Sequence, residues 1–357
     1  MVNLNQYKGK RVFITGHTGF KGGWLVKILN ILGAEVKGYA LIPNKGPCFF
    51  DALHIDHCCE NVFGNILNIS HLSDEIKKFQ PDFIFHLAAQ PLVRLSYEDP
   101  SYTFYVNAIG TANILNAVRE LDKACTLVMI TTDKVYHNNE WEYPYRECDP
   151  LGGYDPYSAS KACAELVINS FRNSFFHPDK YAKHKKAILT ARAGNVIGGG
   201  DWAQDRLIPD IVKALEQSEE IILRNPTAVR PWQHVLEPLC GYLHLGLLGG
   251  KQYQSIPKAF NFGPCAEDTL TVEEMTAMAI QLWGHGSYRI ETNTEQVHEA
   301  NLLKLDISLA KKELEWQPKL NASQALEWSL AWYLDYYKSP SSIAQLTDKQ
   351  IDEYLSL

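Results

Sequence analysis

Tyr157 and Lys161 are the side chains whose spacing most directly suggests chemistry, in the segment Tyr157-Ser-Ala-Ser-Lys161. Residues four apart lie on one face of a helix, so the ammonium group can sit beside the phenol oxygen. Lowering the pKa of a tyrosine from about 10 to about 7 needs roughly 4 kcal/mol of preferential phenolate stabilisation, which a buried lysine and a second positive charge nearby would supply together. The pair predicts a tyrosine that takes a proton from an alcohol. An ordinary amphipathic helix is the alternative, because this spacing is frequent by chance.

A second polar group, Thr132-Asp133-Lys134, directly follows the apolar run 127–130. In a parallel sheet, the carboxyl end of a strand opens into the ligand cleft. Asp133 could then act as an acid, and Lys134 as a base if the site lowers the pKa of its ammonium group. A solvated turn is the alternative interpretation of the same three residues.

A glycine-rich loop, Gly16-His-Thr-Gly19-Phe-Lys-Gly22, lies between the apolar run 11–15 and a helical pattern of apolar residues. In this context the backbone N–H groups and the positive helix end can face a pyrophosphate, so the loop predicts a dinucleotide site. The next expected strand ends at Tyr39-Ala40-Leu41, without the acidic residue that normally holds the adenosine ribose. The choice between NAD and NADP therefore stays open at this position.

The elements that would position these groups alternate between strand and helix. Strands are expected at 11–15, 35–40, 82–87 and 127–130, and helices at 70–79 and 102–121. This alternation predicts an α/β fold, a Rossmann-type doubly wound parallel sheet. We expect residues 1–190 to form an NAD-binding Rossmann domain. Residues 191–357, with three consecutive glycines at 198–200 and frequent prolines, should form mainly a smaller mixed α/β substrate-binding lobe, with some segments returning to the first domain.

The composition narrows the class of protein further. The 357 residues are 46% hydrophobic, enough for a substantial core, and the net charge of −7 offers no broad basic surface for nucleic acid. Eight scattered cysteines without a Cys-x-x-Cys pair indicate reduced thiols and no metal site. Neither a targeting segment nor an apolar run of membrane-spanning length is evident, so we expect a cytoplasmic protein without membrane contact.

Polar residues in the second half could bind a nucleoside diphosphate. Asn195 offers an amide, and Arg206 and Arg230 offer forked donors that match phosphate geometry. Either arginine could equally form half of a surface ion pair, and the sequence does not decide between the two.

Together these motifs resemble the extended short-chain dehydrogenase/reductase family, in its nucleotide-sugar dehydratase branch, over nearly the whole chain. The resemblance rests on six ordered blocks: Gly16–Trp24, Ala88–Arg94, Thr132–Lys134, Gly152–Tyr157, Arg192–Trp202 and Arg230–Pro238. Sister dehydratases for thymidine and guanosine sugars usually carry Asp-Glu where this chain has Asp133-Lys134. The difference fits the cytidine branch and implies CDP-glucose as the small-molecule substrate.

The resemblance also implies which residues form the site. Those implied to be catalytic are Thr132, Asp133, Lys134, Tyr157 and Lys161. Those implied to bind NAD are Gly16, Thr18, Gly19, Phe20, Lys21, Gly22, Asn65, Ile66, Leu87, Ala88, Ala89, Asn107, Tyr157 and Lys161. Those implied to bind the substrate are Gln90, Arg94, Asn195, Arg206, Arg230 and His298.

By the same resemblance, Tyr157 would take the proton of the sugar 4-hydroxyl while a hydride passes to NAD. Lys134 would then remove the C5 proton and Asp133 would protonate the leaving 6-hydroxyl, before the hydride returns to C6. Thr132 would hold the sugar or the tyrosine. The 4-dehydro-6-deoxy product would feed deoxysugar synthesis for surface polysaccharides. The resemblance further implies a homodimer, or a dimer of dimers, pairing through helices around 102–121 and 157–175.

Three other functions remain open at this point, of which the first is a 4,6-dehydratase that acts on another nucleotide sugar. A nucleotide-sugar 4-epimerase shares the glycine loop, Tyr157 and Lys161 but needs no acid/base pair to expel water. A non-catalytic cofactor sensor would keep the dinucleotide fold, although such proteins tend to lose the tyrosine or the lysine. The Asp133-Lys134 pair is the feature that favours a dehydratase over the epimerase.

Overall fold

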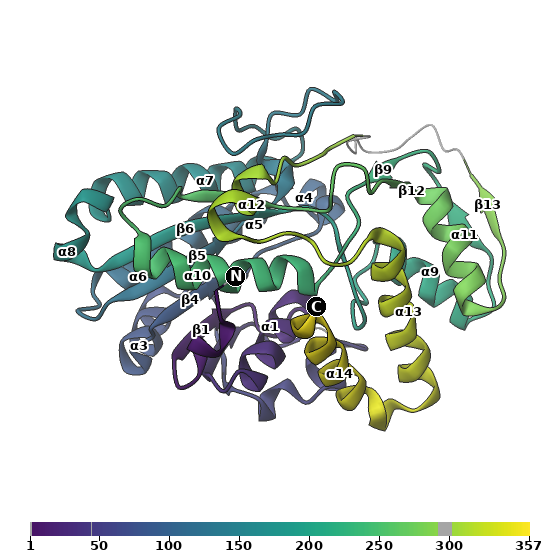
Figure 1. Cartoon of the computed structure of the whole chain (residues 1–357), viewed down its shortest axis with the longest axis horizontal. Helices are drawn as coiled ribbons and strands as arrows, with labels where there is room; N and C mark the ends of the chain where they lie inside the picture. The colour runs from purple at the N-terminus through teal and green to yellow at the C-terminus, as the bar shows by residue number, and fades with distance from the viewer. Residues whose placement is uncertain (1, 44, 292–301) are drawn as a thin grey trace.

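A parallel sheet forms the centre of the computed structural model, which describes residues 2–43, 45–291 and 302–357 (Figure 1). Its strand order is β11-β6-β5-β4-β1-β2-β3, and every neighbouring pair is parallel. The strands are β1 (Arg11–Thr15), β2 (Glu35–Ala40), β3 (Glu60–Phe63), β4 (Phe83–His86), β5 (Cys125–Ile130), β6 (Lys186–Ala193) and β11 (Ala259–Phe262). The predicted Rossmann-type doubly wound sheet is therefore confirmed.

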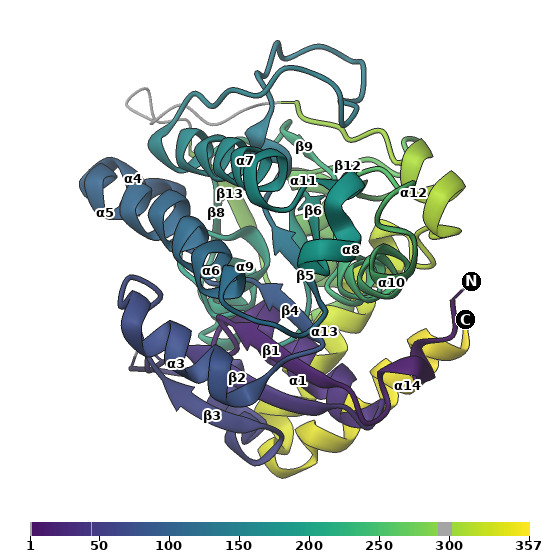
Figure 2. The ribbon, with the colours of Figure 1, turned by 90° about the vertical axis from the view of Figure 1, so that its left-hand side faces the viewer.

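Helices cover both faces of this sheet, because buried side chains of one strand alternate between two cores. Phe13 of β1 and Leu127 of β5 pack in a core with α3 (Ile69–Phe79), α6 (Gly110–Arg119) and α7 (Pro156–Phe175). Val12 and Val128, on the opposite face, pack with α1 (Phe20–Ile31) and α10 (Leu236–Gln252). Figure 2 shows the two helical layers on either side of the strands.

The second half of the chain builds a smaller set of elements beside the sheet (Figure 1). Three two-stranded sheets pair β10 with β7, β12 with β9 and β13 with β8. Their bounds are β7 (Val196–Ile197), β8 (Ile221–Leu223), β9 (Val229–Arg230), β10 (Gln233–His234), β12 (Leu270–Thr271) and β13 (Tyr288–Ile290). The accompanying helices are α9 (Leu207–Glu216), α11 (Val272–Trp283), α13 (Ala322–Lys338) and α14 (Ile343–Ser356).

The remaining helices are short. They are α2 (Phe49–Ala52), α4 (Val93–Glu98), α5 (Pro100–Phe104), α8 (Tyr181–His184) and α12 (Ser308–Leu314), with single turns at Leu4–Tyr7, Ile55–His57, Asp133–Val135, Pro178–Lys180 and Pro340–Ser342. A π-helical turn, Tyr105–Ile109, joins α5 to α6 inside the helix expected at 102–121. Such turns place a side chain where a regular helix would not, and are frequent at functional sites.

Two long-range contacts tie the end of the chain to its beginning. β11 lies at the sheet edge beside β6, although about 65 residues of the second half separate them. The last helix, α14, packs on α1, where Lys27 Nζ lies 2.7 Å from Asp348 Oδ1. Within the described ranges, none of the helices has the length and apolar character needed to cross a membrane.

Candidate active site

The polar turn after β5 carries the predicted acid/base group. β5 is buried throughout, and its chain continues into a single 3-10 turn, Asp133–Val135, which Thr132 caps by accepting a hydrogen bond from the Lys134 N–H at 3.4 Å. The capping hydroxyl also donates to Asp133 Oδ1 at 2.9 Å. Asp133 is buried while Lys134 is half-buried. The turn therefore presents both groups at the carboxyl end of a central strand.

Tyr157 comes to the same place from the start of α7. Asp155 caps this helix by accepting from the Ser158 N–H at 2.9 Å, and Pro156 fills its first position. The Tyr157 phenol hydrogen-bonds to the Thr132 side chain. Burial raises the pKa of Tyr157 to about 12, which the Thr132 hydrogen bond partly opposes. In the protein alone, the phenol is thus protonated at neutral pH.

Lys161 lies one helical turn after Tyr157, also buried. Its Nζ donates to the Ile130 carbonyl at 3.2 Å, which holds the ammonium group at the end of β5. Burial lowers the pKa of Lys161 to about 8, and the Glu165 carboxylate opposes this shift. The predicted contact between the ammonium group and the phenol is not among the hydrogen bonds of the described residues. An influence of Lys161 on Tyr157 in this state is therefore electrostatic or indirect.

Burial raises the pKa of the Asp133 carboxyl, against the opposing effects of Lys134, the Thr132 hydrogen bond and Lys21. A carboxyl group shifted upward in this way holds a proton more readily, as a general acid requires. The Cβ of a side chain at position 194 would stand 2.9 Å from Asp133 Oδ2 and 2.9 Å from Pro231 Cγ, so Gly194 allows the carboxylate to lie against the backbone.

The glycine loop forms a cradle with one open side. Gly16 has φ +80° and a Cβ there would meet the Ala88 nitrogen at 2.7 Å, while a Cβ at Gly22 would meet the Gly16 carbonyl oxygen at 2.1 Å. At Gly19, which precedes α1, the nearest such atom is the Gly16 oxygen at 3.4 Å, and no side chain caps the helix. The uncapped N–H groups and this open space fit the diphosphate of a dinucleotide.

The other predicted cofactor residues lie in the loop itself, at the start of α1, or just after β3 and β4. Thr18 Oγ1 donates to the Leu41 carbonyl at 3.0 Å and joins the loop to the end of β2. Phe20 and Lys21 open α1, and burial together with the Arg206 charge lowers the pKa of Lys21 to about 8. Asn65 and Ile66 follow β3, and Ile66 packs against Gly110. Leu87, Ala88 and Ala89 follow β4.

Asn107 occupies the π-helical turn and is buried. Its side-chain nitrogen donates to Ser160 Oγ at 2.8 Å and to the Gln90 carbonyl at 3.1 Å, while its Oδ1 accepts from the Gln90 N–H at 2.9 Å. Asn107 thereby joins the loop after β4 to the helix that carries Tyr157. Ser160, the partner of Asn107, was not predicted as a site residue. Its position inside Tyr157-Ser-Ala-Ser-Lys161 is the one sequence signal that could have indicated it.

The predicted substrate residues are less uniformly placed. Arg206 NH1 lies 2.7 Å from Asp201 Oδ2, and the Arg206 charge also acts on Tyr157. Arg94 NH1 lies 3.0 Å from Asp205 Oδ1. The two carboxylates were not among the sequence predictions. A charge-pairing argument alone could not have selected them from the 41 acidic residues.

Gln90 uses its side-chain amide within its own loop, donating to Leu92 and to Thr103 Oγ1 and accepting from the Leu92 N–H. Asn195 is half-buried beside Gly194. His298 lies outside the described residues.

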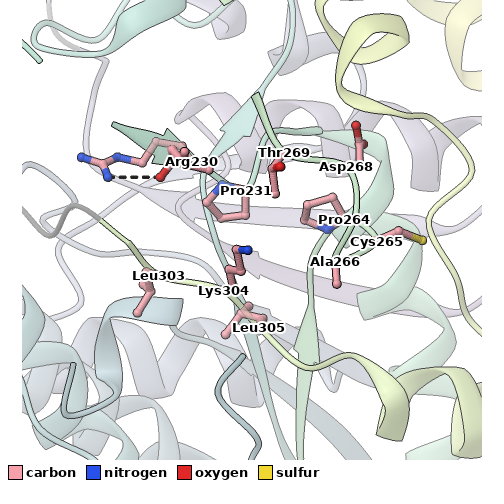
Figure 3. A pocket seen from close by; sticks show the side chains of 11 residues that line it. Arg230, Pro231, Pro264, Cys265, Ala266, Asp268, Thr269, Leu303, Lys304 and Leu305 are labelled. Carbon is pink, nitrogen blue, oxygen red and sulfur yellow. Dashed lines mark hydrogen bonds between the residues drawn. The ribbon is translucent and has the colours of Figure 1, made fainter. Parts of the chain in front are cut away.

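Arg230 borders a shallow pocket of about 310 Å³ that is open to solvent. Figure 3 shows its guanidinium group directed away from Pro264 and Cys265, with NH1 donating to the Val229 carbonyl at 3.4 Å. The lining residues are Val229, Arg230, Pro231, Pro264, Cys265, Ala266, Asp268, Thr269, Leu303, Lys304 and Leu305. Pro231 also contacts the Gly194 position beside Asp133, so the pocket adjoins the turn Asp133–Val135, the predicted catalytic turn.

Comparisons with known proteins show what this chain is similar to. Residues 13–328 match the family described as GDP-mannose 4,6 dehydratase. The chain is 44% identical over 356 residues to a CDP-glucose 4,6-dehydratase of Salmonella typhimurium, with 100% of this chain and 99% of that protein covered. It is 26% identical to a UDP-glucose 4-epimerase of Mycoplasma pneumoniae, covering 77% of this chain and 82% of that protein.

A solved structure of dTDP-glucose 4,6-dehydratase from Bacillus anthracis in complex with NAD has the same fold, with a TM-score of 0.76 and 20% identity over 95% of this chain and 100% of that chain. The residues that match the family include the glycine loop Gly16–Gly22 and the turn Asp133–Val135, and the similarity to the Salmonella relative covers the full length of the chain. The chain therefore belongs to the GDP-mannose 4,6 dehydratase family.

Proposed function

We propose that the protein is a CDP-glucose 4,6-dehydratase, which converts CDP-D-glucose to CDP-4-dehydro-6-deoxy-D-glucose and water. The observation that carries the proposal is the hydrogen-bonded row Tyr157, Thr132 and Asp133, in which a buried carboxyl with a raised pKa stands beside the catalytic phenol. A 4-epimerase needs the phenol but not this acid. The full-length relative of the same name supports the choice.

NAD is the proposed cofactor, and its chemistry here is to accept a hydride from C4 of the sugar and return it to C6. The open side of Gly19 and the uncapped start of α1 would hold the diphosphate, and Lys161 would hold the nicotinamide ribose. Relatives of the same fold bind NAD, which supports NAD rather than NADP where Leu41 replaces the usual acidic residue.

The proton transfers belong to the chain's own side chains. Tyr157 Oη, as the phenolate, takes the proton of the 4-hydroxyl and becomes a phenol, and the positive charge of Arg206 favours the phenolate that this step needs. Lys134 Nζ takes the C5 proton once C4 is a carbonyl carbon, and returns it to C5 when the hydride reaches C6. Asp133 then gives its proton to the departing 6-hydroxyl, so that water leaves as a neutral molecule.

The substrate's nucleotide fits the surroundings of the catalytic turn. Arg94, Arg206 and Arg230 offer planar donors that match a diphosphate. The small, open pocket beyond Pro231 would contact one side of the nucleoside, with Thr269 and Lys304 as polar groups at its edge. Asp201 and Asp205 hold two of the arginines in the protein alone and would exchange them with the incoming phosphates.

The experiment is to mix purified protein and NAD separately with CDP-, dTDP-, UDP- and GDP-sugars and to follow product masses. Loss of one water from CDP-glucose alone is the expected result. An isomer of unchanged mass would identify an epimerase instead. No reaction with any sugar would favour a non-catalytic cofactor sensor.

We also propose a homodimer that pairs through the helical segment 102–121, which includes α6, and through α7. Apolar side chains are exposed along this side of the molecule, including Tyr105 (60% exposed), Ile109 (46%), Leu166 (59%) and Phe175 (44%). The helices pack on each other and form one outer layer in Figure 2. Pairing would remove this apolar surface from water.

Light scattering after size-exclusion chromatography tests the dimer. We expect Ile109→Glu with Leu166→Glu to give monomers, whereas Ile222→Glu, at a residue 49% exposed in β8, should leave the mass unchanged. A wild-type monomer would contradict the proposal.

We further propose a cytoplasmic location, which the eight free thiols support.

A further inference from the structure

A buried network of charged and polar side chains lies next to the active site, and the proposed mechanism does not use it. At its centre, Arg192 of β6 donates to both carboxylate oxygens of Glu165, at 2.8 Å and 3.0 Å. Arg192 also donates to the Tyr136 hydroxyl at 2.8 Å, which in turn donates to Asn261 of β11 at 2.7 Å. The network therefore joins two strands to the segment after the catalytic turn.

Glu165 connects this network to both carriers of catalytic residues. It lies on α7 one turn after Lys161, and its Oε1 accepts from Thr131 Oγ1 at 2.6 Å. Thr131 immediately precedes Thr132 and Asp133 at the end of β5. A single carboxylate thus fixes the end of the strand against the helix that bears Tyr157.

The charge of Glu165 also faces Lys161. Lys161 also interacts electrostatically with Lys21 at the start of α1 and with His86 of β4. Burial lowers the pKa of His86 to about 3, so its imidazole is neutral. Among these described groups, Glu165 supplies the negative charge. Without it, burial and Lys21 would both favour the neutral amine.

A buried ion pair is weak support for stability, because well-packed apolar residues of similar volume often serve equally well. The presence of Glu165 is better explained by what its charge does for its neighbours. Resting on the proposed function, we propose that Glu165 is a positioning residue for the oxidation step, which aligns the end of β5 with α7 and places a negative charge one helical turn from Lys161.

The test uses the full-length enzyme with NAD and CDP-glucose, and follows the absorbance of NADH in a single turnover between about pH 6 and pH 9. For Glu165→Gln we expect the alkaline fall in rate to move to lower pH by about one unit, which is a typical effect of losing one nearby charge. The variant should then be about tenfold slower at the upper end and near normal at the lower end. Glu165→Asp, which keeps the charge, should restore the wild-type profile.

Glu165→Gln leaves Arg192 buried without its counter-ion, which destabilises the fold, so a second variant is needed. The paired change Glu165→Leu with Arg192→Met removes both charges and should give the same shift in the pH profile. Thr131→Val is the matched control, because it removes only the hydrogen bond and should slow the reaction without moving the profile. An equal loss of rate at every pH in folded variants would overturn the proposal.

The affinity for NAD separates this proposal from the proposed function. If the wild-type enzyme does not dehydrate CDP-glucose, the substrate assignment fails. The alkaline fall in NAD affinity should still move to lower pH in Glu165→Gln, because Lys161 faces the cofactor. An unchanged pH dependence of both NAD affinity and rate would refute the role of Glu165.

Discussion

Thr132 has one hydroxyl hydrogen, and the direction in which it is donated links Tyr157 to Asp133. Because Thr132 Oγ1 donates to Asp133 at 2.9 Å, it can only accept from the Tyr157 phenol. Burial, and not this hydrogen bond, keeps the phenol protonated in the protein alone, because the Thr132 contact opposes the rise in the pKa of Tyr157. Thr132 therefore contacts both the proposed base of the first step and the proposed acid of the second.

Changing Tyr157 to Phe removes the proton acceptor while keeping the buried ring. We expect turnover to fall by about 1,000-fold, the scale of general acid–base catalysis, with nucleotide binding near normal. Coupled measurement of product formation and of CDP-glucose affinity checks both parts. Retained activity would remove Tyr157 from the role of base.

Changing Asp133 to Asn removes the acid but keeps the shape of the side chain. Elimination should slow by about 100-fold, and more than C4 oxidation does, so NADH should accumulate during a single turnover. Rapid-mixing absorbance spectroscopy measures this accumulation. If turnover is unchanged and no NADH accumulates, Asp133 is not the acid.

Among the loops, two glycines lie where a side chain would disturb the proposed site: Gly19 in the glycine loop and Gly194 in the turn after β6. A methyl group at Gly19 would meet little beyond the Gly16 oxygen at 3.4 Å, yet it would enter the open side of the cradle. We expect Gly19→Ala to keep the melting temperature of the protein alone but to weaken NAD binding by about tenfold or more, equivalent to about 1.4 kcal/mol.

Titration calorimetry with NAD tests this prediction. Gly22→Ala provides the contrast, because its Cβ would stand 2.1 Å from the Gly16 oxygen and should destabilise the packing of α1 itself. Wild-type affinity for NAD in Gly19→Ala would place the diphosphate elsewhere.

Gly194, in the turn between β6 and β7, leaves room for the carboxyl group of Asp133, the proposed acid. Gly194→Ala would put a Cβ 2.9 Å from both Asp133 Oδ2 and Pro231 Cγ, so one of them must move. We expect dehydration to slow by about tenfold while C4 oxidation continues, since small displacements of catalytic groups are costly. Gly263→Ala, whose Cβ would make ordinary contacts at 3.6 Å and beyond, is the control. Equal loss of both steps in Gly194→Ala would indicate general disruption.

At the scale of the whole molecule, buried neutral histidines make the fold sensitive to acid. Burial lowers the pKa of His86 and of His234 to about 3. His86 lies between Thr15 and Thr111, and His234 between the rings of Trp24 and Trp328. Below about pH 6.5 the unfolded chain binds these protons and the native state does not.

The free energy of unfolding should therefore fall as the pH drops from about 6.5 towards 3, by about 1.4 kcal/mol per pH unit for each histidine. Urea unfolding at a series of pH values measures the slope. His234→Gln should reduce it by about one proton, whereas His57→Gln, at a side chain 77% exposed, should not. A slope that His234→Gln leaves unchanged would contradict this explanation.

The features that depend on local geometry could be predicted from the sequence. A spacing of four residues puts Tyr157 and Lys161 on one helical face, and a glycine loop between strand and helix forms a cradle whatever surrounds it. Alternating apolar runs likewise predicted the parallel sheet, and the family resemblance is confirmed. The strand β3 was missed, because its short sequence Glu-Asn-Val-Phe lacks an apolar run.

Contacts between residues far apart in the chain could not be predicted from the sequence and are seen in the folded structure. The pairing of Arg94 with Asp205, the place of β11 beside β6, and the contact of Glu165 with Thr131 join segments far apart in the chain. The pKa shifts of Asp133 and Lys161 also depend on burial, which a residue's neighbours in sequence do not fix. Motifs are local in sequence, whereas desolvation and ion pairing depend on packing, and packing is a property of the folded chain.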